Sequence, residues 1–203
     1  GVISPGDRIR VQPSGRESRV ARIVTLDGDL EQAVAGQSIT LTLTDEIDVS
    51  RGDVICTVDD PISVADQFQA TLVWMDQQPM LAGRSYLLKI GCKTVNASLA
   101  APRYKVNVNT LEHLACRQLE LNEIGVCNLS TDEPICFDPY KDNRETGSFI
   151  LIDRLTNATV GAGLLEFSLR RAQNIHVQHV DVSKGARAEQ LGHDARHVQV
   201  IAI

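Results

Sequence analysis

Two glycines near the C-terminal end of the chain, Gly161 and Gly163, have the Gly-x-Gly spacing of loops that cradle a phosphate group. A dinucleotide-binding loop also needs a third glycine three residues further on, and it opens a helix whose N-terminus meets the phosphate. Here Gly163 is followed by Leu-Leu-Glu-Phe, which continues a strand pattern, and no Lys-Ser/Thr pair of a P-loop follows. Small residues within a strand usually mark a bulge or a close approach of two backbones. We therefore predict that both glycines lie in a sheet and bind no nucleotide.

Histidines are the second set of side chains whose spacing is compatible with chemistry. Four of the five lie close to the C-terminus: His176, His179, His193 and His197. Pairs separated by three or four residues can hold a metal ion when they share a face and other ligands complete the site. Asp181 and Asp194 are the oxygen ligands nearest to these histidines in the sequence, and no cysteine is close. We therefore expect a solvated tail that binds no structural zinc.

No nucleophile or acid–base pair is recognisable in the sequence. The chain lacks the Gly-x-Ser-x-Gly motif of a nucleophilic serine, and none of its five cysteines is in a Cys-x-x-Cys pair. The carboxylate pairs Asp45-Glu46 and Asp132-Glu133 lie in turn-like sequence, where solvated carboxylates are normal. The sequence thus predicts no catalytic, cofactor-binding or metal-binding residue in this chain.

The overall charge limits the partners of the protein. A formal charge of −6 argues against a general nucleic-acid binder, which usually has a basic face. A local basic strip remains an alternative, with one stacking surface at Tyr104 and these cations: Arg84, Lys89, Lys93, Arg103 and Lys105. Aromatic residues make up only 4% of the chain, which leaves little for base stacking. We expect weak RNA binding at most.

The location of the protein follows from the same bulk properties. No apolar run is long enough to span a bilayer, and the first ten residues do not resemble a signal peptide. The odd number of cysteines favours reduced, mostly buried thiols over a disulfide framework. We therefore expect a cytoplasmic protein with no membrane partner.

Strand patterning dominates the elements that would position any functional residue. Residues 7–12 alternate the apolar Ile9 and Val11 with arginines, and residues 37–43 alternate in the same way. Such period-two alternation places one face of a strand on a core and the other face in water. Many short strands separated by turn residues are typical of all-β barrels or sandwiches. The chain is therefore predicted to be all-β.

Breaks in this pattern divide the chain into three parts. The strand pattern restarts after Asp59-Asp60-Pro61, and the sequence becomes polar from Arg170 onward. We predict a first barrel over residues 1–60, a second barrel over 61–168, and a linker or irregular C-terminal arm over 169–203. Within the barrels, Asp27-Gly28 predicts a hairpin turn, because both residue types tolerate positive φ. The ambiguous segment 110–123 is interpreted as irregular or as a single helical turn.

Several strings in the sequence resemble a known family. Residues 1–55 are similar to the second domain of elongation-factor-Tu-like GTPases, and in particular to the large, GTPase subunit of bacterial sulfate adenylyltransferase. The strings LDGDLEQAVAGQ (26–37) and DEIDVSRGD (45–53) carry this likeness. The second half resembles the third domain of that subunit, in AGRSYLLKIGCKTVNASL, VNTLEHLACRQLELNEIG and NRETGSFILIDRLTNATVGAG. The resemblance covers about residues 1–168, and generic translation factors lack these strings.

The resemblance implies two consecutive small Greek-key β-barrels of the elongation-factor domain 2 and domain 3 type. In the family, the barrels brace a GTPase domain and hold the small adenylyltransferase subunit, while GTP hydrolysis drives formation of adenylylsulfate from ATP and sulfate. GTP, ATP and magnesium are therefore implied for the full-length protein and not for this chain. The segment RRAQNIHVQHVDVSKGARAEQLG (170–192) resembles the connector to a fused adenylylsulfate kinase.

The resemblance does not include the catalytic part of the family. The family's GTPase domain, with its P-loop, precedes the barrels and would lie before Gly1, as would the first strand of the first barrel. No catalytic residue of the family has a matching position in this chain. Two alternatives stay open: translation-factor-like barrels that bind tRNA, and a free-standing binding module.

Overall fold

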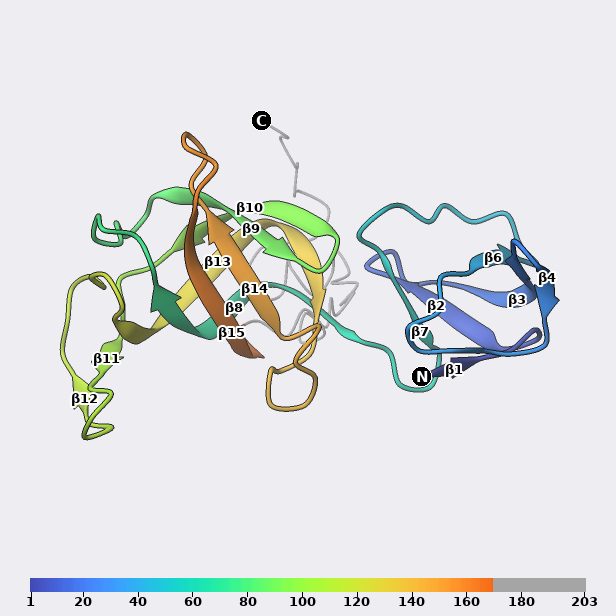
Figure 1. The fold of residues 1–203 in the computed structure, drawn as a ribbon, viewed down its shortest axis with the longest axis horizontal. Coiled ribbons are helices and arrows are strands. Elements are labelled where there is room, and N and C mark those ends of the chain that lie inside the picture. Colours follow the sequence, from blue (N-terminus) through green and yellow to red (C-terminus); the bar gives the residue numbers. More distant parts are fainter. Residues whose placement is uncertain (170–203) are drawn as a thin grey trace, which may run out of the picture. The chain divides into compact units, whose positions relative to one another are not determined.

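The computed structural model describes residues 1–169. Within this part of the chain every regular element is a β-strand, which confirms the all-β prediction (Figure 1). The four C-terminal histidines and the proposed arm beyond residue 169 lie outside the described residues, so the expectation that they bind no zinc stays a prediction. The predicted domain limits at residues 60 and 168 also stay predictions.

The first seven strands build an open barrel. They are β1 (Val2–Ile3), β2 (Arg8–Gln12), β3 (Arg16–Thr25), β4 (Gly28–Leu30), β5 (Ala33–Val34), β6 (Thr40–Leu43) and β7 (Val54–Thr57). Strands β4, β3, β2 and β7 pair in this order and β6 pairs with β3, all antiparallel. In the described residues β1 pairs with β5 alone, in a separate two-stranded sheet. The first barrel is therefore a half-barrel.

The core of this half-barrel is small and aliphatic. In β2, Ile9 and Val11 are buried while Arg8 and Arg10 face outward, as the alternation predicts. β3 contains a register shift between Val20 and Arg22, and such a bulge lets one strand bend and pair with both β2 and β6. The buried cluster consists of Ile9, Val11, Val20, Ile23 and Ala33.

The remaining eight strands build a closed barrel. They are β8 (Ser63–Trp74), β9 (Ser85–Ile90), β10 (Lys93–Leu99), β11 (Tyr104–Val106), β12 (His113–Leu114), β13 (Ile124–Phe137), β14 (Ser148–Ile152) and β15 (Thr159–Ser168). Six of them pair in the order β10, β9, β14, β15, β8 and β13, and a further pairing of β10 with β13 closes the ring (Figure 1). Closure leaves no open sheet edge in this ring.

Large side chains fill the closed barrel. Trp74 and Tyr86 are buried and meet edge to face with ring centroids 5.8 Å apart. Phe68 and Phe137 form a second edge-to-face pair at 4.9 Å. Both arrangements are favourable aromatic geometries. The second barrel thus has an aromatic core that the half-barrel does not have, since the first 60 residues contain no Phe, Trp or Tyr.

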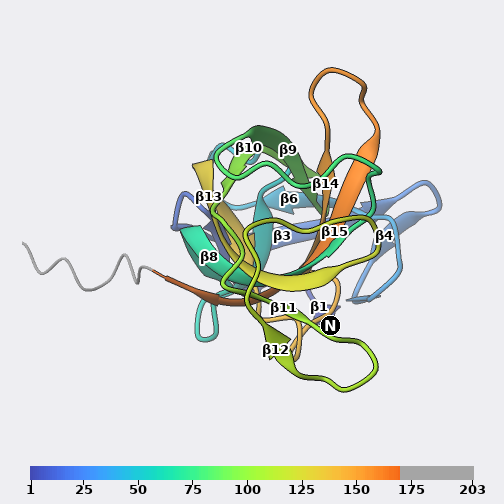
Figure 2. The same ribbon diagram turned by 90° about the vertical axis from the view of Figure 1, so that its left-hand side faces the viewer.

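Two local predictions are refined by the structure. Thr25 pairs with Gly28, so the hairpin between β3 and β4 turns at Leu26-Asp27, one residue earlier than Asp27-Gly28. Of the residues Leu26, Asp27 and Gly28, only Gly28 has a positive φ, of 121°. Gly28 is the first residue of β4. The segment 110–123 is mostly irregular, and it also holds the short strand β12, which forms a hairpin with β11. Figures 1 and 2 show this hairpin extending away from the second barrel.

The two glycines with phosphate-loop spacing lie in β15, as predicted. Gly161 pairs with Leu151 and Gly163 with Phe149 across the β14–β15 ladder. A Cβ atom at Gly163 would lie 2.1 Å from Cζ of the Phe149 ring, and one at Gly161 would lie 3.2 Å from the carbonyl oxygen of Val73. The glycines therefore allow close packing in the barrel wall, and they are followed by the rest of β15, which continues to Ser168.

Asp153 is a buried carboxylate that fixes the turn between β14 and β15. Its Oδ1 accepts hydrogen bonds from the backbone N–H of Leu155 at 2.9 Å and of Thr156 at 3.0 Å. Its Oδ2 accepts from the guanidinium of Arg84, which lies 69 residues earlier in the chain. The amides of Thr156 and Leu155, and more weakly Arg84, hold the pKa of Asp153 below its usual value.

We expect the contribution of Asp153 to stability to depend on pH. Because its folded-state pKa is lowered, the contribution is complete above the unfolded-state pKa of about 3.9 and is lost as the pH falls through the folded-state value. Asp153→Asn should therefore be destabilising at pH 7, and its difference from the wild type should shrink toward pH 3. Urea unfolding followed by Trp74 fluorescence measures this, with Asp142→Asn in an exposed loop as the control. An equal loss at both pH values would contradict the prediction.

Candidate functional site

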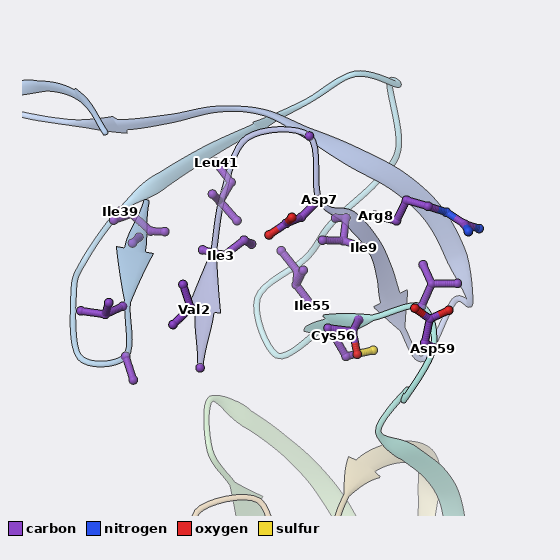
Figure 3. Close-up of a pocket in the computed structure, with 17 residues that line it drawn as sticks. Val2, Ile3, Asp7, Arg8, Ile9, Ile39, Leu41, Ile55, Cys56 and Asp59 are labelled. Carbon is purple, nitrogen blue, oxygen red and sulfur yellow. The ribbon is translucent and has the colours of Figure 1, made fainter. Parts of the chain in front are cut away.

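The half-barrel opens into an apolar groove of about 790 Å³, which we call the N-terminal groove (Figure 3). Its apolar lining comes from β1, β2, β6, β7 and the residue before β6, and includes Val2, Ile3, Ile9, Ile39, Leu41 and Ile55. Val2 is 62% exposed, whereas Ile9 is buried at the base. In the described residues β1 pairs with β5 alone and β7 with β2 alone, so each leaves one edge without a strand partner.

The polar groups around the N-terminal groove do not form a catalytic set. The carboxylate of Asp7 accepts a hydrogen bond from the backbone N–H of Ser4 at 2.8 Å, which closes a turn. Arg8 extends away from the groove and pairs with Glu17 at 3.2 Å (Figure 3). The groove therefore suits an apolar segment with backbone hydrogen-bonding groups, and not a reacting small molecule.

Three thiols of the second barrel, those of Cys116, Cys127 and Cys136, are poor nucleophiles. Burial raises the pKa of Cys127 to about 12 and that of Cys136 to about 11. Burial also raises the pKa of Cys116. Because the thiolate is the nucleophile and the metal ligand, these thiols stay protonated and unreactive at neutral pH. Within residues 1–169 no three His, Cys, Asp or Glu side chains are grouped so that they could hold a metal ion.

Three of the five cations of the basic strip considered from the sequence are paired with carboxylates in the fold. Arg84 pairs with Asp153, Lys105 with Glu123, and Lys93 with Glu133, the last at 3.2 Å. Arg103 donates to the side-chain oxygen of Gln69. Tyr104 stacks on His113, with ring centroids 3.9 Å apart and 17° between the planes, so one face of its ring is occupied. These contacts reduce the free charge and the stacking surface that a nucleic-acid site would need.

A polar cluster on the outer surface of the second barrel was not predicted from the sequence. Glu166 accepts hydrogen bonds from the amide of Gln69 at 2.5 Å and from the hydroxyl of Thr71 at 2.7 Å. Arg103 completes the cluster through Gln69, which is buried. Polar residues at alternate positions of β8 were the available signal, but the partners are more than 90 residues apart in the chain. The cluster joins β8 to β15 and has a structural role.

No helix in residues 1–169 is long and apolar enough to cross a membrane.

Comparison with known proteins defines the class of the chain. Residues 67–166 match the family described as GTP-eEF1A C-terminal domain-like. The crystal structure of Sup35 complexed with GMPPNP superposes with a TM-score of 0.75 at 20% sequence identity, over 84% of this chain and 42% of that one. The Sup35 structure with GDP gives the same score at 21% identity. The likeness to the two Sup35 structures shows that this chain shares their fold over most of its length.

Proteins with similar sequences give a more specific comparison than the shared fold does. The chain is 51% identical over 189 residues to the bifunctional enzyme NodQ of Rhizobium sp., and 51% identical over 188 residues to the bifunctional enzyme CysN/CysC of Xylella fastidiosa. It is 54% identical over 166 residues to sulfate adenylyltransferase subunit 1 of Shewanella woodyi. The matches cover 93%, 93% and 81% of this chain, but only 29%, 30% and 35% of the relatives. The chain is thus a homologue of part of NodQ, CysN/CysC and sulfate adenylyltransferase subunit 1, as the sequence resemblance indicated.

Proposed function

We propose that this chain is the non-catalytic barrel portion of the GTP-dependent large subunit of sulfate adenylyltransferase. That enzyme couples GTP hydrolysis to the formation of adenylylsulfate from ATP and sulfate in sulfate assimilation. The observation that carries the proposal is about 50% identity to three proteins of this kind across both barrels. GTP, ATP and magnesium would then be bound by other parts of the longer protein, in the cytoplasm.

The partners in this proposal are protein surfaces. They are the GTPase domain of the same subunit, the small adenylyltransferase subunit and, in bifunctional relatives, a fused adenylylsulfate kinase domain. The paired charges around Arg84, Lys93 and Lys105 support a role that involves neither nucleic acid nor membrane. Exposed apolar residues offer candidate contacts, among them Val108 and Leu111 on the β11–β12 hairpin, which are 61% and 74% exposed.

Titration against the purified small adenylyltransferase subunit tests this function. We expect the chain to bind it measurably, though less tightly than the full-length large subunit does, because the GTPase domain's contacts are missing. The pair Val108→Ser and Leu111→Ser on the hairpin, compared with Leu26→Ser on the β3–β4 turn, would locate the contact on one barrel. No binding at high micromolar concentration would remove the barrels from that interface. Tight tRNA binding at physiological salt would instead favour translation-factor-like barrels.

A further inference from the structure

Four arginines share the outer surface of β2 and β3 in the first barrel, and we call this surface the arginine face. It consists of Arg8, Arg10, Arg19 and Arg22. The strand alternation that buries Ile9 and Val11 turns Arg8 and Arg10 to the outside. Arg8 and Arg22 are well exposed, with side-chain exposures of 55% and 62%. The face is therefore accessible over both strands.

The arginine face contains a cross-strand pair of like charges. Arg8 lies directly opposite Arg19 in the antiparallel register of β2 and β3. Like charges in directly opposed positions destabilise a sheet. Arg19 donates a hydrogen bond to the carbonyl oxygen of Gly6 at 3.0 Å, and none of the ion pairs within residues 1–169 includes it. Residues that lower the stability of a fold are expected mainly at functional sites, and the opposed pair Arg8 and Arg19 is of this kind.

The arginine face already contains carboxylates, but they are too few to neutralise its positive charge. Glu17 is shared between Arg10 at 2.5 Å and Arg8 at 3.2 Å, and Arg10 is the main cause of its lowered pKa. Asp29 makes two parallel contacts to Arg22, at 2.6 and 2.8 Å, which lower the pKa of Asp29. Two carboxylates thus face four guanidinium groups. The geometry on the surface is suited to carboxylate oxygens.

The choice of cation on the first barrel is also informative. Residues 1–60 contain six arginines and no lysine, together with eleven carboxylates. Arginine presents a rigid fork that binds carboxylate or phosphate through two parallel hydrogen bonds, whereas lysine is a point charge. The positive charge is concentrated on the arginine face, while the acidic residues of the barrel lie mainly in its turns, at residues 27–31, 45–48 and 59–60.

We propose that the arginine face binds an acidic segment of a partner protein through its carboxylates. The inference rests on the charge pattern of the first barrel and is independent of the proposed function. Nucleic acid fits the face less well because residues 1–60 contain no aromatic side chain for base stacking. The excess of carboxylates over arginines in the same residues would also repel a long polyphosphate chain. A short acidic protein segment meets only the local positive charge.

Fluorescence anisotropy with a labelled deca-glutamate peptide tests the proposal on the 203-residue chain. We expect binding that weakens steeply between about 20 mM and about 300 mM salt, because the contacts are exposed ion pairs. The double variant Arg8→Gln and Arg19→Gln should weaken binding by at least about tenfold. Arg51→Gln, which changes an exposed arginine outside the face, should change it by less than about twofold. A deca-glutamine peptide serves as the uncharged control and should not bind.

A second readout separates docking from a structural role of the arginines. Removing the opposed pair Arg8 and Arg19 should leave the unfolding temperature unchanged or raise it, since repulsion is relieved. The lysine variants Arg8→Lys and Arg19→Lys keep the charge and should still lose part of the affinity, because the bidentate fork is gone. Absence of peptide binding by the wild type, an equal loss in Arg51→Gln, or tighter binding of a single-stranded oligonucleotide than of the peptide would each overturn the proposal.

Discussion

Gly163→Ala should lower the free energy of unfolding of the second barrel by about 1–3 kcal/mol, the usual cost of inserting a methyl group into a packed core. The new Cβ would lie 2.1 Å from Cζ of Phe149, and that ring is buried, with 3% of its surface exposed. The ring has little room to move, because it belongs to the continuous core of the closed barrel. Trp74 is the single tryptophan of the chain and is buried in this core, so its fluorescence reports the unfolding directly.

A double-mutant cycle with Phe149→Leu identifies the cause of the loss. The smaller side chain removes the ring atoms nearest to the new methyl group, so the two substitutions together should cost less than the sum of their separate costs. Residues in direct contact commonly show such coupling. Ala162→Ser, between the two glycines and half-buried, is the matched control and should be close to neutral. If Gly163→Ala lowers the free energy of unfolding no more than the control does, the Phe149 ring can move aside without strain and the prediction is wrong.

The Gly161–Gly163 stretch also shows what could be predicted from the sequence. Its strand pattern and the missing third glycine were enough to exclude a phosphate loop, because these features are local. The alternation of Ile9 and Val11 predicted the buried face of β2 for the same reason. The exact register of the β3–β4 hairpin could not be predicted from the sequence, because Gly28 tolerates a positive φ either within a turn or at the start of a strand.

Long-range pairing was not accessible from the sequence. Arg84 and Asp153 are 69 residues apart, and Lys93 meets Glu133 only because β10 closes the barrel against β13. From the sequence alone Arg84 and Lys93 look like free cations, whereas in the folded chain each forms an ion pair with a carboxylate. The N-terminal groove was not accessible either. Its lining comes from the two-stranded sheet of β1 and β5 and from the separate sheet that holds β2, β6 and β7, and the pairing of strands into sheets is a long-range property.

The first barrel should open before the second one does. Its buried cluster consists of five aliphatic residues, whereas the closed barrel has a core with several large aromatic side chains. The N-terminal groove exposes the apolar lining of β1 and β7, and within residues 1–169 each of these strands has an edge without a strand partner. Exposed strand edges exchange their amide hydrogens easily or pair with another molecule. The resemblance to elongation-factor domains led to the same expectation, because it implies a strand before Gly1.

Hydrogen exchange measured by mass spectrometry tests this expectation. Amides of residues 7–11 and 37–43 should exchange about 100-fold faster than those of β8 and β13, which serve as the internal reference. If the free edge also drives self-association, Val2→Lys on β1 should reduce it, because a charged residue blocks edge-to-edge pairing. Leu26→Lys, at a fully exposed turn position away from this edge, should have no effect. Equal protection of both barrels without self-association would mean that the half-barrel is stable with its groove open.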